Sequence, residues 1–128
     1  FLMITSFAGV GAVTRAPIGV IRSVPETRRL LEDVLAEIVT VARARRVDLP
    51  EKAADAALEV LERFEPASTA SMQRDITEGL PSELEFLTGA VVRLGHDAGV
   101  ATPVNRYIYR SLLPSEQRAR GAVDWPGS

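Results

Sequence analysis

The sequence lacks cysteine and contains a single histidine, and these two absences exclude several kinds of site. Without thiols there is no disulfide scaffold, no cysteine nucleophile and no zinc site built on thiolates. His96 alone is too few imidazoles for a histidine-rich metal centre, and a Ser–His–Asp triad would depend on it entirely. We therefore expect no metal site and interpret His96 as a solvated helix residue. The lack of cysteine also suits a reducing cytoplasm, which is the expected location.

A strong charge of one sign and a long apolar run are also missing. The 15 basic residues are offset by 17 acidic ones, so we expect no nucleic-acid partner. The longest uncharged run, residues 1–14, is shorter than the roughly 20 residues that span a bilayer, so we expect no membrane partner. No basic segment precedes this run, which argues against a signal peptide.

What the sequence does contain is typical of one globular domain. Its 128 residues are 46% hydrophobic and 25% charged, which is too apolar for a disordered chain. Because the chain begins with Phe1 and not with Met, we expect it to be an interior piece of a longer protein. We predict a helical domain over residues 1–120 and a frayed tail over 121–128, in which Trp125 could dock.

Apolar residues recur at helical spacing, and no run alternates in the manner of a strand. Residues 25–46 follow the i, i+3, i+4, i+7 series of a helix with one buried face. Further helices are predicted from Pro50 to Pro66 and from the Thr102-Pro103 start to Pro114. The predicted fold class is therefore all-α, a compact bundle of six or seven helices with short connections.

The first segment differs from the others because it is apolar nearly all round. Residues 1–13 include several small residues, among them Gly9 and Gly11. A helix that is hydrophobic on every side is normally buried in the middle of a bundle. A glycine inside a helix costs about 1 kcal/mol relative to alanine, so these glycines need a packing reason or a nearby ligand.

Ser71 is the first candidate binding residue. Ser68 is predicted to cap a short helix that runs to about residue 78 and is ended by Gly79. Ser71 then lies in the first turn, where unpaired N–H groups and the positive dipole end could help to bind a carboxylate or a phosphate. The alternative is that Ser71 only helps to cap the helix.

Glu83 is the second candidate. Ser82 and Glu85 have the spacing of a capping box, which predicts that a helix begins here and that Glu83 lies in its first turn. The helix dipole would keep the Glu83 carboxylate ionised, as an acceptor for hydroxyl groups. The alternative is an ordinary acidic residue at a helix start.

The order of residues around these two positions carries a family resemblance. The sequence contains, in order, Ser71-Met72-Gln73-Arg74-Asp75-Ile76, Glu78-Gly79, Pro81-Ser82-Glu83, Gly89-Ala90-Val91-Val92-Arg93-Leu94 and Thr102-Pro103-Val104-Asn105. This order resembles the C-terminal domain of the ketopantoate reductase (2-dehydropantoate 2-reductase) family. Residues 2–19, with Thr14-Arg15-Ala16-Pro17 and Gly19, look like the start of the same domain. The resemblance covers about residues 1–114 and implies a helical bundle like the C-terminal domain of 6-phosphogluconate dehydrogenase.

The resemblance implies part of an NADPH-dependent oxidoreductase of pantothenate biosynthesis. Enzymes of this family have an N-terminal Rossmann domain that binds NADPH and a helical C-terminal domain that closes over a 2-keto acid, which is reduced to a 2-hydroxy acid. The family's catalytic lysine precedes the position of Phe1, so we expect no catalytic residue in this chain, whose only lysine is Lys52. The implied partners are the 2-keto acid and the Rossmann domain of the same protein, and a homodimer is left open. The fragment alone is expected to be inactive.

The resemblance also implies roles for individual residues. Ser71 matches the serine that contacts the substrate carboxylate, and Glu83 matches the glutamate that hydrogen-bonds in the cofactor and substrate cleft. The family usually has substrate-binding asparagines at the positions of Ile4, Ala8 and Ile18, all apolar here. We therefore expect the substrate to be a less polar 2-keto acid or ketone.

Two other readings remain open. The chain could be the helical domain of a hydroxyisobutyrate-type dehydrogenase, although those enzymes lack the Ser-Met…Glu pairing at this spacing. It could also be a non-catalytic helical dimerisation or interaction module, in which Ser71 and Glu83 would not converge on one cleft. A domain that is normally closed by its partner should expose an apolar or mixed face when isolated, so we predict that this fragment self-associates through its helices.

Overall fold

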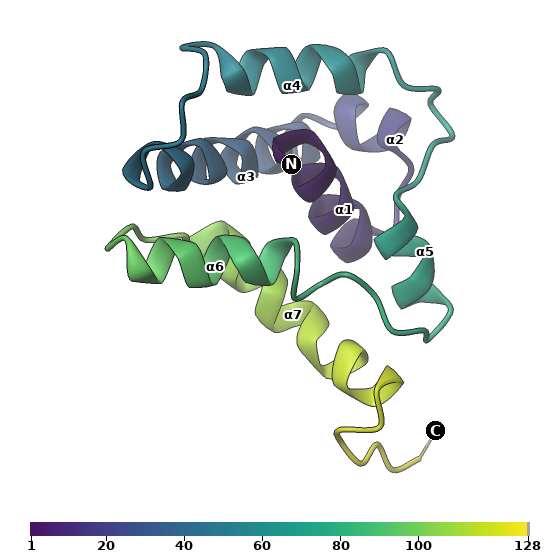
Figure 1. Ribbon diagram of the computed structural model, residues 1–128. Coiled ribbons are helices and arrows are strands. Elements are labelled where there is room, and N and C mark those ends of the chain that lie inside the picture. The colour runs from purple at the N-terminus through teal and green to yellow at the C-terminus, as the bar shows by residue number, and fades with distance from the viewer. Residues whose placement is uncertain (128) are drawn as a thin grey trace.

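The computed structural model describes residues 1–127, and within that range it contains seven helices and no strand (Figure 1). This confirms the prediction of an all-α bundle. His96 is exposed near the end of a helix, as expected. None of the helices described is long and apolar enough to cross a membrane. In chain order the helices are α1 (Leu2–Thr14), α2 (Ile18–Ser23), α3 (Pro25–Ala44), α4 (Ala53–Glu62), α5 (Ser71–Thr77), α6 (Thr88–Asp97) and α7 (Pro103–Ala119).

Helix α1 lies in the middle of the bundle and contacts each of the other six helices. Residues 5–12 of α1 are all buried, so the apolar segment has the central position that its composition predicts. Its glycines have packing reasons. A Cβ on Gly9 would lie 3.3 Å from the Thr88 hydroxyl oxygen of α6, and a Cβ on Gly11 would meet the side-chain amide of Gln73 on α5.

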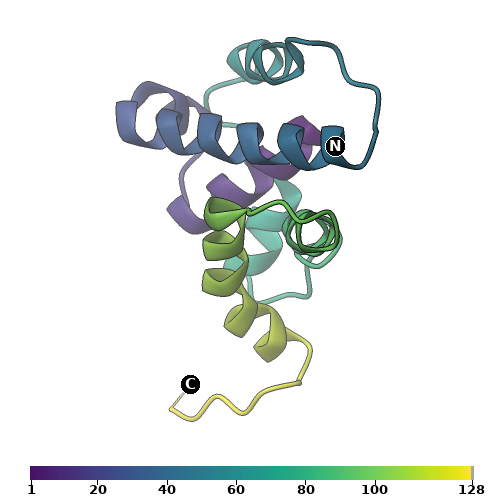
Figure 2. The same cartoon turned by 90° about the vertical axis from the view of Figure 1, so that its left-hand side faces the viewer.

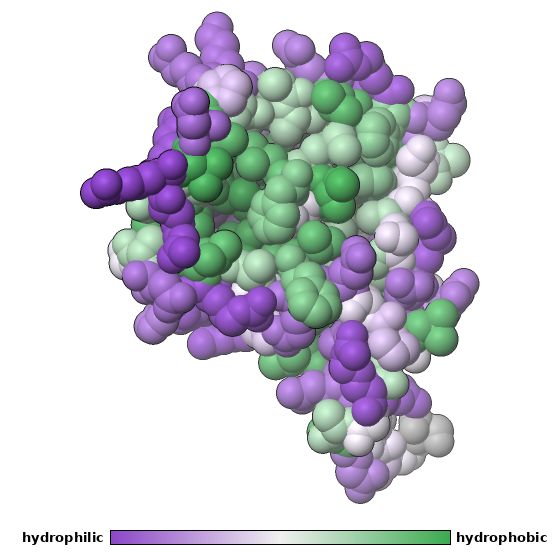
Figure 3. All heavy atoms as spheres, viewed as in Figure 1, coloured by the Kyte–Doolittle hydropathy of each residue, from purple (hydrophilic) through white to green (hydrophobic). Residues whose placement is uncertain are grey.

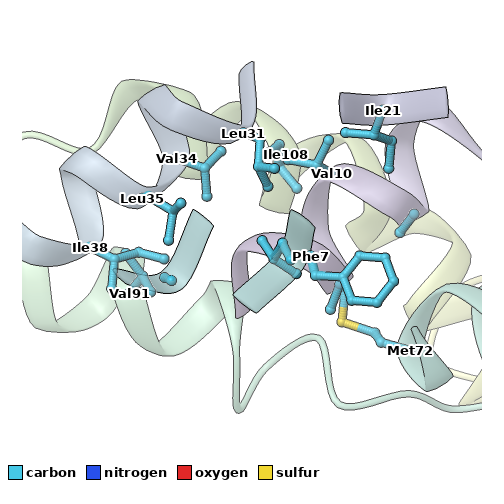
Figure 4. Packing of buried hydrophobic residues seen from close by; sticks show 14 of the residues in the cluster. Phe7, Val10, Ile21, Leu31, Val34, Leu35, Ile38, Met72, Val91 and Ile108 are labelled. Atoms are coloured by element: carbon cyan, nitrogen blue, oxygen red, sulfur yellow. The ribbon is translucent and has the colours of Figure 1, made fainter. Parts of the chain in front are cut away.

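Around α1, the predicted one-sided helices present their apolar faces to a shared core (Figure 4). Helix α3 contributes Leu31, Leu35 and Ile38, which are buried at the predicted spacing. Helix α4 covers another side of α1, and the ring of Phe64 after α4 meets the ring of Phe7 on α1 edge to face, with centroids 5.7 Å apart.

Several predicted helix boundaries are wrong, among them the start at Pro50, since α4 begins at Ala53. Helix α5 begins at Ser71 with Ala70 as its N-cap residue, so Ser68 is not the cap. The carbonyl of Ser68 instead accepts a hydrogen bond from the backbone N–H of Ile18, at 2.9 Å. Helix α7 does not end at Pro114 but continues to Ala119. The proline removes one backbone donor, and the buried Glu116 beyond it holds the last turns in place.

The start of α7 is capped from another helix. Pro103 occupies the first turn as predicted, but the Thr102 side chain makes no cap hydrogen bond. The Glu37 carboxylate of α3 accepts the backbone N–H groups of Val104 and Asn105, each at 2.9 Å, together with the Asn105 side-chain amide at 2.8 Å. This contact fastens α7 to α3 at the point where α7 begins.

Residues 120–127, which follow α7, run away from the bundle as an exposed segment (Figure 2). Trp125 in this segment lies under the guanidinium of Arg118, whose central carbon is 4.5 Å from the ring centroid. The interaction is a cation–π contact, and it shows where Trp125 docks.

Candidate functional site

Ser71 lies at the point where the starts of α2 and α5 come together. The backbone N–H groups of Ile18 and Gly19 donate to the carbonyls of Ser68 and Pro66, both at 2.9 Å. This approach requires glycine at position 19, because a Cβ there would lie 2.8 Å from the Pro66 Cα and 2.9 Å from the Pro66 carbonyl oxygen. The segment that leads into α5 is therefore fixed to the start of α2 by backbone contacts.

The Ser71 side chain is exposed and makes no hydrogen bond within the described residues. The side chains of the residues that follow it, in contrast, stabilise the fold. Met72 and Gln73 are buried, and the Arg74 guanidinium donates to the Thr69 carbonyl at 2.6 Å and to the Thr69 hydroxyl at 2.9 Å. The hydroxyl of Ser71 is therefore available to a ligand.

Glu83 is not in the first turn of a helix, so that prediction is wrong. Residues 83–87 form successive turns, and α6 begins at Thr88 with Leu87 as its N-cap residue. No capping box forms, because the side chains of Ser82 and Glu85 are bonded to residues of α6 and α7. The Glu83 carboxylate therefore does not lie at the positive dipole end of α6.

Ser82 is held by a buried carboxylate from α7. Glu116 is only 2% exposed, and its oxygens accept the Ser82 hydroxyl at 2.5 Å and the Ser82 backbone N–H at 3.1 Å. Arg120 donates from Nε to Glu116 at 2.6 Å and from Nη2 to the Ser82 carbonyl at 3.0 Å. Burial by itself would raise the pKa of Glu116, but the hydrogen bonds from Ser82 and the charge of Arg120 outweigh it and lower that pKa.

Glu85 is held by α6 and α7. Its carboxylate accepts from Arg93 at 2.8 Å and from the Tyr109 hydroxyl at 2.6 Å, and its backbone carbonyl accepts a second Arg93 N–H at 2.7 Å. Burial, and then the hydrogen bond to Glu85, raise the pKa of Tyr109 to about 12. The phenol thus stays a donor to Glu85 throughout the neutral range.

Glu83 itself is exposed, and its side chain forms no hydrogen bond or ion pair within the part of the chain that the structure describes. Its backbone carbonyl accepts the N–H groups of Phe86 and Leu87, both at 3.0 Å. The carboxylate is therefore presented to solvent from a segment that is fixed on either side.

The three apolar residues expected at the family's asparagine positions lie in different surroundings. Ile4 is 52% exposed on α1, whereas Ala8 and Ile18 are buried in the core. Their proposed part in substrate binding stays a prediction, as does the convergence of Ser71 and Glu83 on one cleft. Among the described residues, no group of three or more histidine, aspartate or glutamate side chains could hold a metal ion.

Sequence reasoning missed Glu116, although its position carries a signal. Ile108, Leu112 and Glu116 follow one another at four-residue spacing on the inner face of α7. A charged residue in such an apolar series must find partners when buried, so the spacing itself predicts a buried hydrogen-bonded carboxylate.

An apolar hollow of about 370 Å³ opens beside the start of α1. Phe1, Val47 and Leu94 line it, with other residues of α3 and α6. Figure 3 shows apolar side chains gathered on the face that carries the N-terminus, bordered by hydrophilic ones. The bundle thus has the exposed apolar face that was expected.

Comparison with known proteins supports the resemblance noted in the sequence. The 2-dehydropantoate 2-reductases of Pyrobaculum aerophilum and Vibrio cholerae are each 33% identical to this chain, over 112 and 94 residues. These matches cover 85% and 73% of the chain but only 40% and 31% of the relatives, so the chain spans less than half of their length.

Solved structures share the helical fold. A ketopantoate reductase of the PanE/ApbA family from Ralstonia eutropha matches 93% of this chain and 40% of its own, with a TM-score of 0.83 and 28% identity. A dimeric ketopantoate reductase from Staphylococcus aureus matches 92% of this chain and 41% of its own, with a TM-score of 0.86 and 24% identity. The fold is thus that of a helical domain found in these reductases. Residues 1–116 match the family described as "Ketopantoate reductase PanE/ApbA C terminal", and the chain belongs to this family.

Proposed function

We propose that this chain is the substrate-binding and closing domain of an NADPH-dependent oxidoreductase that reduces a 2-keto acid to a 2-hydroxy acid. The observation that carries the proposal is a pair of side chains that form no hydrogen bond or ion pair with any of residues 1–127. The resemblance gives Ser71 and Glu83 the family's two binding positions. Both side chains are exposed, and neither is used to hold the fold together.

In this proposal the Ser71 hydroxyl donates a hydrogen bond to the substrate carboxylate, and the Glu83 carboxylate accepts hydrogen bonds from hydroxyl groups in the cleft. NADPH supplies the hydride when bound. An exposed, unpaired carboxylate suits a ribose hydroxyl, so Glu83 would be this chain's contribution to cofactor binding. The Rossmann domain would bind most of the cofactor, in the cytoplasm.

The lysine that polarises the carbonyl would also come from outside these residues. The only lysine present, Lys52, is an exposed N-cap residue of α4, at the edge of the bundle. We therefore propose that these 128 residues alone bind weakly and do not turn over.

The exposed side chain of Ile4 is the reason for proposing a less polar substrate. A net hydrogen bond contributes about 1 kcal/mol, so losing three asparagines would weaken ketopantoate binding by roughly two orders of magnitude. Of the three positions, only Ile4 has an exposed side chain in this chain. The residue in contact with the substrate's distal group is thus proposed to be Ile4.

The complete gene product should oxidise NADPH faster with 3,3-dimethyl-2-oxobutanoate than with ketopantoate, which differs from it by one hydroxyl group. We expect Ile4→Asn to shift the ratio of the two kcat/KM values toward ketopantoate by about fivefold, the effect of one hydrogen bond. Ser71→Ala should raise KM for both acids by about tenfold or more, since it removes a hydrogen bond to a charged group. Ser23→Ala, an exposed serine of α2, is the control. Efficient turnover of ketopantoate at low micromolar KM would contradict the substrate proposal.

We also propose that the isolated domain self-associates through the apolar hollow beside α1. Sedimentation analysis should show a concentration-dependent dimer, and Leu94→Glu should weaken it at least tenfold by placing a charge in the hollow. Tyr107→Glu, on an exposed position of α7 outside the hollow, should leave it unchanged. A monomer at all concentrations would count against this interface.

A further inference from the structure

The segment 82–85 is fixed at three of its four residues. Ser82 and Leu84 are buried, and Glu85 is bonded to Arg93 and Tyr109. Glu83 is the residue of this segment whose side chain is exposed and forms no hydrogen bond or ion pair with the described part of the chain. A segment with this pattern holds its backbone still while it offers a single carboxylate to the outside.

Glu116 provides the tightest of these anchors. Together with Arg120 it binds the hydroxyl, the N–H and the carbonyl of Ser82, which are all the polar groups that this residue has. The Ser82 hydroxyl also accepts the backbone N–H of Leu84 at 3.2 Å, so the contact extends across Glu83 to the residue that follows. The peptide units on either side of Glu83 are therefore held by the Arg120 guanidinium and by the Ser82 hydroxyl, and Glu116 binds both of these groups.

A buried carboxylate is a costly way to fasten a loop. Removing its charge from water is unfavourable, and apolar residues of similar volume often stabilise a fold equally well. What an apolar residue could not do is fix the direction of Ser82, because it has no oxygen that accepts N–H and O–H groups, whereas an ionised carboxylate accepts several of them strongly. The choice of glutamate at position 116 thus favours orientation over simple burial.

We propose that Glu116 is a positioning residue, which fixes the backbone at Ser82 so that the Glu83 carboxylate points in one direction in the cleft. The inference rests on the proposed function, because it takes Glu83 to bind the cofactor or the substrate. Arg120 assists by neutralising the buried charge and by holding the Ser82 carbonyl.

The anchoring itself can be tested on this chain without any activity. In Glu116→Gln, which is nearly isosteric, hydrogen exchange at the amides of residues 82–87 should become at least tenfold faster, while the amides of α3 keep their wild-type rates. Glu62→Gln is the matched control, because Glu62 pairs with Arg28 on the surface. Unchanged exchange at 82–87, or an equal acceleration throughout the chain, would overturn the proposal.

The positioning role can be tested in the complete reductase with a double-mutant cycle. Glu116→Gln and Glu83→Gln should each raise KM for NADPH or for the keto acid, and the change in KM relative to the change in kcat should be the same for both variants. We expect each variant to lower kcat/KM by about tenfold overall. Adding Glu116→Gln to Glu83→Gln should then change kcat/KM by less than twofold. A merely structural role would lower kcat through loss of folded enzyme, leave KM unchanged and act independently of Glu83, and that result would overturn the proposal.

The cycle also separates this inference from the proposed function. If Glu83→Gln impairs turnover and Glu116→Gln does not, only the positioning role is overturned. If Glu83→Gln has no effect, the binding role proposed for Glu83 fails, and the positioning role fails with it. The exchange measurement still decides whether Glu116 holds the segment.

Discussion

Replacing Phe7 by alanine should lower the free energy of unfolding by about 3–5 kcal/mol, the range for truncating a buried phenylalanine. Phe7 is 6% exposed at the centre of α1, and its ring meets that of Phe64 edge to face. The substitution would remove both the buried ring and the aromatic contact that links α1 to the end of α4. Urea unfolding followed by circular dichroism would measure the change.

The matched control is the same substitution at Phe86, which is 72% exposed. We expect Phe86→Ala to change the free energy of unfolding by less than about 0.5 kcal/mol, as is usual for surface positions. Similar losses for the two variants would contradict the placement of α1 at the centre of the core.

Replacing Gly19 by alanine should destabilise the domain by about 1–3 kcal/mol and disturb the surroundings of Ser71. The added Cβ would lie 2.8 Å from the Pro66 Cα, and a backbone atom cannot move aside as a side chain can. The cost of overpacking should therefore outweigh the roughly 1 kcal/mol that alanine gains in helix propensity. The backbone contacts between α2 and the segment before α5 would separate.

Gly9→Ala is the comparison for this variant, because Gly9 is also a glycine inside a helix at which a Cβ would come close to other residues. Its nearest neighbours would be the side chains of Thr88 at 3.3 Å and Ile108 at 3.4 Å, which can shift slightly. Thermal unfolding should show a clearly lower Tm for Gly19→Ala than for Gly9→Ala. Substrate KM in the complete enzyme should rise only for Gly19→Ala. Equal effects would show that the approach to Pro66 is not required.

Much of the fold was predictable because it follows from local periodicity. The one-sided pattern of 25–46 gave the buried face of α3, and the all-round apolarity of 1–13 gave the central place of α1. The glycines at positions 9 and 11 were expected to need a packing reason or a nearby ligand, and the structure provides the packing reason. These features depend only on residues close together in the chain.

The surroundings of Glu83 could not be predicted in the same way. Ser82 and Glu85 satisfy the spacing of a capping box, but both side chains are bonded to α7 instead, Ser82 to Glu116 and Glu85 to Tyr109. Glu37 likewise caps a helix that starts more than 60 residues later. Spacing rules describe neighbours in sequence, and these polar groups are satisfied by residues that only the tertiary fold brings near.

The central place of α1 has a consequence for how the polypeptide is made. The ribosome releases α1 before the six helices that surround it, so this apolar segment of the nascent chain stays exposed until α7 has emerged. Contacts between the beginning and the end of a chain are slow to form, and exposed apolar surface favours aggregation in the meantime. Chaperone capture during translation should therefore concentrate on this stretch and end once the last helix closes over it.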